Sequence, residues 1–183
     1  MALFRKHRQP EELGAMLYEA LRSGMESDTG ELSLKLYVEG LDVDPKDMDE
    51  QYVGQAMVGL MFGATLAIER SATANVAEQI GSGMKTAFLN HVIEQGADAI
   101  QKAEWENVIA AVFLTYRKRL EGYSGFEPPW KLGRELYWNV IGKEEYNTMA
   151  IKISTLYLLA ARDTCQELLN EYGPTLVMRA GTY

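Results

Sequence analysis

Apolar residues recur every three or four positions along most of the chain, which is the spacing that places side chains on one face of an α-helix. Leu13, Leu17 and Leu21 form the first such stripe. Pro10 and two glutamates precede it, and they suit the start of a helix because proline fits the first turn and carboxylates favour its positive end. We therefore predict a helix that begins at Pro10 and ends near Gly24.

Residues 31–39 carry two conflicting signals. Alternate positions are apolar, as in a β-strand: Leu32, Leu34, Leu36 and Val38. Asp28 and Glu31, in contrast, have the spacing of a capping box, which opens a helix. A lone strand would have no partner, since strand signals are almost absent elsewhere in the chain. We predict a helix here, with a strand as the open alternative.

The most apolar segment, residues 51–68, contains no charged side chain. We predict that it belongs to one helix from Pro45 to Arg70, with Asp44 as the N-cap. Because this helix is apolar around its whole circumference, we expect it to lie at the centre of the fold, surrounded by other helices.

Three small residues spaced four apart share one narrow face of this central helix: Gly59, Gly63 and Ala67. A glycine inside a helix costs up to about 1 kcal/mol relative to alanine, so its presence calls for an explanation. Close approach of a second helix provides one, because small residues let two backbones come together. We predict that this face is a helix-packing surface.

The same segment is close to the length of about 20 apolar residues that a membrane-spanning helix needs. However, acidic residues flank its N-terminal end, Gln55 and Thr65 lie inside it, and no second long apolar segment accompanies it. A membrane span is flanked by interfacial aromatic or basic anchors, whereas the flanks here are Asp47, Asp49 and Glu50 on one side and Glu69 with Arg70 on the other. We therefore predict a helix buried in protein, and no membrane partner.

Four further helices are predicted from periodic apolar stripes and from glycine or proline stops. The first runs from about residue 75 to residue 96, and the glycines in "GSG" at 81–83 can interrupt it. The others run from residue 98 to about 120, from 129 to about 141, and from between 143 and 146 to 173. The clearest loop lies at residues 121–130.

The predicted fold class is therefore all-α, a single-domain helical bundle of six or seven helices around a central apolar helix. This domain spans residues 9–174, between a flexible basic tail (residues 1–8) and a C-terminal tail (residues 175–183). A hydrophobic fraction of 47% and a charged fraction of 24% are typical of globular proteins. A chain of 183 residues is long enough to bury one core.

The net charge and the single cysteine indicate which binding partners and which cellular compartment to expect. A formal net charge of −8 opposes non-specific binding to nucleic acid or to anionic lipid, since both need a cationic face. One cysteine cannot form an intramolecular disulfide, and no apolar run follows the basic N-terminus as it would in a secretory signal. We expect a cytoplasmic protein with no nucleic-acid partner.

Candidate motifs for metal and phosphate chemistry fail on the residues that they require. The acidic segment that starts at Asp42 lacks the glycine of a calcium-binding loop and has Val53 where the bidentate glutamate belongs. "GSGMKT" lacks the distal glycine of a phosphate-binding loop and has Met84 before the lysine. Of the two histidines, one lies in the N-terminal tail. We predict no catalytic residue, no metal site and no cofactor.

Five side chains are candidates for ligand binding: Glu69, His91, Tyr116, Arg117 and Arg119. Arg117 and Arg119 lie near the end of a predicted helix, where cations complement the negative end of the helix dipole. As an alternative, one of them grips a carboxylate or phosphate while Tyr116 packs beside it. His91 is either a hydrogen-bonded residue at the edge of the core or part of a pocket.

Two functional hypotheses follow from these residues. The first, which the lack of catalytic groups and the abundant apolar helical surface favour, is a non-catalytic regulatory or scaffold protein. It binds a protein partner or itself, as a symmetric homodimer. The alternative is a small-molecule-binding protein or enzyme with a pocket between helices near His91, Tyr116 and Arg117. An open cavity containing one of these side chains favours the alternative, and a solid core opposes it.

Overall fold

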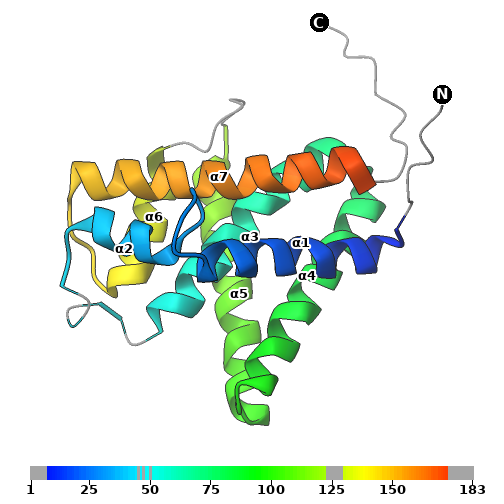
Figure 1. Cartoon of the computed structure of the whole chain (residues 1–183), viewed down its shortest axis with the longest axis horizontal. Coiled ribbons are helices and arrows are strands. Elements are labelled where there is room, and N and C mark those ends of the chain that lie inside the picture. The colour runs from blue at the N-terminus through cyan, green and yellow to red at the C-terminus, as the bar shows by residue number, and fades with distance from the viewer. Residues whose placement is uncertain (1–7, 45, 47, 50, 123–129, 173–183) are drawn as a thin grey trace, which may run out of the picture.

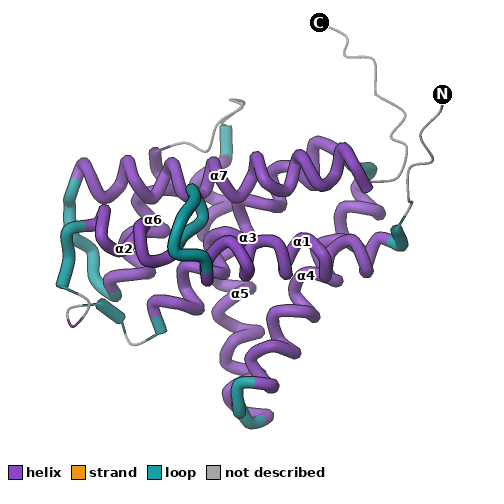
Figure 2. The backbone as a smooth tube through the Cα atoms, viewed as in Figure 1, coloured by secondary structure: helices purple, strands orange, loops and turns teal. Residues whose placement is uncertain are grey.

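Seven α-helices make up the fold of the described residues, and Figures 1 and 2 show no strand among them. The computed structural model describes residues 8–44, 46, 48–49, 51–122 and 130–172. The helices are α1 (Pro10–Glu26), α2 (Leu34–Leu41), α3 (Tyr52–Ser71), α4 (Ala74–Glu94), α5 (Ala99–Leu120), α6 (Trp130–Ile141) and α7 (Thr148–Tyr172). The all-α prediction is confirmed. The basic tail, except for its last residue, and the C-terminal tail lie outside the described residues.

The apolar helix α3 lies at the centre of the fold, as predicted. It contacts α1, α4, α5, α6 and α7, and it contributes an almost continuous run of buried residues from Ala56 to Ile68. By length and composition alone, α3 is the one described helix that could cross a membrane, and about two thirds of its most apolar window is buried inside the protein. Its apolar circumference is therefore explained by the helices packed around it.

The start of α3 differs from the prediction, because the helix begins at Tyr52 and not at Pro45. Met48 is buried and non-helical, and the backbone N–H of Asp49 donates to the carbonyl oxygen of Val140 in α6 at 3.3 Å. Asp44 accepts a hydrogen bond from the backbone of Lys46 at 3.0 Å, which closes a short turn. Met48 and Asp49 are not part of α3, so the prediction of one continuous helix from residue 45 is wrong. Pro45 itself lies outside the described residues.

Residues 34–41 form the short helix α2, so the helix prediction for residues 31–39 is confirmed in its larger part. Ser33 caps it by accepting a hydrogen bond from the backbone N–H of Leu36 at 3.3 Å. Two contacts with α7 fix α2 in place. The Tyr37 ring stacks on Tyr157 with centroids 4.2 Å apart, and the Tyr37 hydroxyl lies 2.8 Å from the hydroxyl of Ser154. The cap is therefore Ser33 and not Asp28.

Glycines mark the places where two helix backbones come closest. A Cβ added to Gly14 of α1 would lie 3.0 Å from the Cα of Gly83 and would also clash with the backbone of Ile80, both in α4. Despite "GSG", α4 is one continuous helix. The glycines at 81–83 therefore do not interrupt the helix, and Gly83 forms a tight packing contact with α1.

The predicted packing face of α3 lies against α6 and α7. A Cβ at Gly63 would lie 2.8 Å from the carbonyl oxygen of Leu158 and 3.3 Å from the Cβ of Ala161, both in α7. Gly59 lies against the side chain of Leu136 in α6, and Ala67 is fully buried.

Helices α4 and α5 form a hairpin whose joined ends project from the body of the molecule (Figure 1). The projection leaves α5 with few buried side chains, namely Ile109, Val112 and Tyr116. Trp105, Val108 and Phe113, which the periodic pattern also places inward, are only half-buried. The space beside the hairpin, between α5 and the body, contains the site described next.

Candidate functional site

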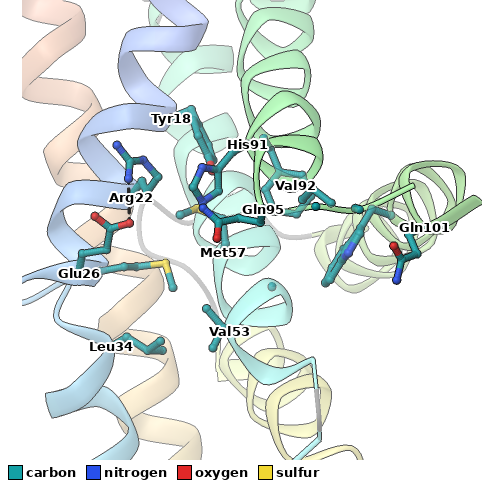
Figure 3. Close-up of a pocket in the computed structure, with 16 residues that line it drawn as sticks. Tyr18, Arg22, Glu26, Leu34, Val53, Met57, His91, Val92, Gln95 and Gln101 are labelled. Atoms are coloured by element: carbon teal, nitrogen blue, oxygen red, sulfur yellow. Dashed lines mark hydrogen bonds and ion pairs between the residues drawn. The ribbon is translucent and has the colours of Figure 1, made fainter. Parts of the chain in front are cut away.

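A pocket of about 500 Å³ opens between the joined ends of the α4–α5 hairpin and helices α1, α2 and α3. Its walls come from segments that are far apart in the sequence, and they meet around one opening (Figure 3). The lining residues are Tyr18, Arg22, Met25, Glu26, Leu34, Val53, Gly54, Met57, Phe88, His91, Val92, Gln95, Gly96, Ala97, Gln101 and Trp105. A smaller hollow of about 120 Å³ adjoins it and shares Ala97, Gln101 and Trp105.

Aromatic rings from three helices form one side of the pocket. Phe88 of α4 makes edge-to-face contacts with Tyr18 of α1 and Trp105 of α5, with ring centroids 6.2 and 5.4 Å apart. The His91 ring lies 6.2 Å from Tyr18. Gly54 of α3 lies against the Trp105 indole, where a Cβ would collide with the ring. The glycine in α3 therefore makes room for the indole, and the rings hold one another in place.

The polar side of the pocket is built around Arg22. Its guanidinium donates from Nε and Nη2 to Glu19 at 3.0 and 2.7 Å, and from Nη1 to Glu26 at 2.8 Å. All three residues lie on α1 at helical spacings of three and four, so the helix itself brings them together. His91 approaches a third carboxylate, that of Glu94, with Nδ1 and Oε2 4.0 Å apart. Figure 3 shows Arg22 paired with Glu26 beside Tyr18 and His91.

Tyr18 is held in its neutral form at the inner wall of the pocket. Burial of the side chain raises the pKa of its hydroxyl well above the ordinary value, and the negative charges of Glu19, Glu26 and Glu94 raise it further against the opposing effect of Arg22. A neutral phenol can donate or accept a hydrogen bond, but it does not serve as a general base near neutral pH. Tyr18 therefore suits ligand positioning better than proton abstraction.

The predicted ligand-binding residues lie in four separate places, and His91 is the one that lines the pocket. Tyr116 is fully buried in the core, edge-on to Phe62 with centroids 4.8 Å apart, and burial raises its pKa above the ordinary value. Arg117 forms an ion pair with Glu69 on the exposed surface between α5 and α3. Arg119 donates to Glu135 of α6 at 2.8 Å.

The structure thus pairs Arg117 with Glu69 and places both away from His91. Arg119 serves a different acid, since Glu135 is nearly buried and a buried carboxylate needs a cationic partner. Arg134 also approaches Glu135, at 3.5 Å. Arg117 and Arg119 therefore link α5 to α3 and α6 through ion pairs.

Sequence reasoning missed most of the pocket. Tyr18 and Arg22 follow each other at helical spacing in α1, and Glu26 continues the same row, so an aromatic, basic and acidic row was visible. Nothing in that row indicates which other helix faces it. The sequence also does not indicate that Gly54 lies against a tryptophan ring.

The described residues give little support for metal binding or for a reactive thiol. Among them, no group of three or more histidine, cysteine, aspartate or glutamate side chains could hold a metal ion. Cys165 is fully buried in α7, and burial raises the pKa of its thiol to about 12. A thiol in this environment stays protonated and is a poor nucleophile.

Comparison of the chain with protein-family models, with curated proteins and with solved structures finds no match. The pocket's own residues are therefore the basis for a functional proposal.

Proposed function

We propose that the protein binds a small, largely apolar molecule in the pocket between Tyr18, His91 and Trp105. The observation that carries this proposal is an open cavity of about 500 Å³ with apolar walls and a few polar groups. Ligand pockets in proteins range over about 300–1,000 Å³ and have this mixed lining. Because the cavity contains His91, it meets the condition that favours the small-molecule hypothesis over the interaction hypothesis.

Binding without catalysis fits the lining groups best. Arg22 and Glu26 are hydrogen-bonded to each other, and Tyr18 is held neutral by its surroundings. His91 lies 4.0 Å from Glu94, and no serine or cysteine is among the residues that line the pocket. Nucleophilic catalysis needs a nucleophile within hydrogen-bond reach of a base. The polar groups are thus placed to orient a ligand, while the apolar walls supply the affinity.

The test measures binding of an uncharged apolar dye, phenylnaphthylamine, whose fluorescence rises when it moves from water to an apolar site. Val53→Trp places an indole at the mouth of the pocket, and we expect it to weaken dye binding by about tenfold or more because the ring occupies ligand space. Val53 is 48% exposed, so the larger side chain does not enter the core.

Leu114→Trp is the matched control, since Leu114 is 56% exposed on α5 and does not line the pocket. It adds the same indole to a comparable helix surface, and dye binding should be unchanged. Equal dye affinity in both variants and the original protein would show that the dye binds elsewhere and would overturn the proposal.

We also propose self-association through the outer surface of α6 and α7, in line with the interaction hypothesis. Large apolar side chains are exposed there, with Tyr146 at 71%. The Tyr146 ring contacts Trp130 at the start of α6, and Met149 and Leu156 are seven residues apart on one exposed face of α7. Exposed apolar side chains of this size favour burial against a second copy.

A further inference from the structure

We infer that the ligand of the pocket is a cationic amphiphile, an apolar body that carries a protonated amine. This inference rests on the proposed function and specifies its ligand class. Three features support it: the charge pairing of the lining arginine, the carboxylates that pair with the lining residues Arg22 and His91, and the aromatic character of the pocket wall.

Arg22 is the one arginine or lysine among the lining residues, and its charge is already matched. Its Nε, Nη1 and Nη2 groups donate to two different carboxylates, those of Glu19 and Glu26. These bonds use three of the five guanidinium N–H groups, and the two carboxylates beside them would repel a carboxylate or phosphate ligand. An anionic ligand therefore finds no unmatched cation on this side of the pocket.

Carboxylates outnumber arginines and lysines among the lining residues and their ion-pair partners. Glu26 lines the pocket with Arg22, while Glu19 pairs with Arg22 and Glu94 lies 4.0 Å from His91 without lining the pocket themselves. Glu104 also lines the adjoining hollow. The negative charges around Tyr18 contribute to the raised pKa of its hydroxyl, which is consistent with this excess.

The aromatic wall offers a second attraction for a cation. Tyr18, Phe88 and Trp105 line the pocket together, and their rings are in mutual contact. The face of an aromatic ring attracts an ammonium group, and clusters of such rings recognise protonated and quaternary amines. Met57 and Val92 provide apolar surface for the remainder of the ligand.

The experiment compares three ligands of one shape: phenylbutylamine, phenylbutanol and phenylbutanoate, each competing with phenylnaphthylamine near pH 7. At that pH the amine is protonated and the acid is ionised. We expect the amine to bind about tenfold more tightly than the acid, with the alcohol between them, because a partly exposed ion pair and a cation–π contact together are worth about one decade in affinity.

Two substitutions on α1 should move this preference in opposite directions. Glu26→Gln removes an acid and should lower the ratio of amine to acid affinity by about threefold, whereas Arg22→Gln removes the cation and should raise it by about threefold. Glu69→Gln is the matched control, because it removes an arginine-paired acid outside the pocket and should leave the ratio unchanged. Phenylbutanol reports on the integrity of the pocket, because a structural effect of a substitution changes the affinity for all three ligands together and leaves the ratio of amine to acid affinity unchanged.

The outcomes separate this inference from the proposal that it rests on. If phenylbutanol competes with the dye but phenylbutanoate binds as tightly as the amine, the pocket binds ligands and the cationic class is wrong. The same holds if both α1 substitutions leave the ratio unchanged. If none of the three ligands displaces the dye, the cationic class and the pocket function are both overturned.

Discussion

Individual glycines determine how closely the helices of this protein pack. Gly14 and Gly83 let the backbones of α1 and α4 meet, and Gly54 leaves room for the Trp105 ring beside the pocket. In contrast, a Cβ at Gly81 would have no neighbour within 4 Å, although this residue lies in the same helix only two positions from Gly83. The same residue type thus has opposite consequences at neighbouring positions.

This contrast predicts opposite effects of two alanine substitutions. Gly83→Ala should lower the free energy of unfolding by about 1–3 kcal/mol, because the methyl group would clash with the backbone of Glu11, which cannot move aside as a side chain can. Gly81→Ala should raise it by about 0.5–1 kcal/mol, because alanine favours helix and meets open space. Urea denaturation of both variants measures the changes, and shifts of the same sign would contradict the assigned contacts.

Among the elements, α3 and α5 differ in how much of each the fold buries. The two helices have 20 and 22 residues, but α3 buries twelve of them while α5 buries three. The capping box of Asp98 and Gln101 secures the first turn of α5. Beyond it, α5 is held to the body by a few side chains and by the ion pairs of Arg117 and Arg119.

Hydrogen exchange should reveal this difference. We expect the backbone amides of residues 99–108 in α5 to exchange at least about tenfold faster than those of residues 57–68 in α3, because local opening of α5 exposes little apolar surface. Mass spectrometry of deuterated peptides measures both segments in one sample. Equal protection of the two segments would show that α5 opens only when the whole protein unfolds.

On the scale of the whole molecule, the apolar surface is divided between an enclosed helix and an exposed region. The helix α3 is surrounded by protein, whereas the outer surface of α6 and α7 presents Trp130, Tyr146 and Met149 to solvent. Burial of α3 within the protein supports the expectation that detergent is not required, and the exposed region supports association of two copies.

Light scattering in detergent-free buffer tests both expectations. We expect a particle of twice the chain mass of 20.5 kDa. Met149→Glu combined with Leu156→Glu should return it to a single chain, because two charges would be buried in the interface. Ile100→Glu, at an exposed apolar residue outside the proposed surface, is the control and should leave the dimer intact. A single-chain mass for the original protein would overturn the dimer, and a need for detergent would overturn the expectation about membranes.

The sequence by itself determined which segments are helical and that α3 lies at the centre. Both depend on the spacing of apolar residues within one segment, as in the stripe Leu13, Leu17 and Leu21, all of which are buried. Segments where a distant contact overrides the local signal were predicted less well. Asp49 donates a hydrogen bond to Val140 of α6, and α3 begins only at Tyr52. No sequence pattern near Asp49 indicates this hydrogen bond.

Only the tertiary structure decided where the pocket lies and what surrounds it. Tyr18, Phe88 and Trp105 come from three helices, and Arg117 meets Glu69 across 48 positions of the sequence. Helical periodicity establishes which face of a helix is apolar, but it does not establish which helix packs against that face. The partners of a side chain follow from how the helices cross, and the crossings here depend on close contacts such as that between Gly14 and Gly83.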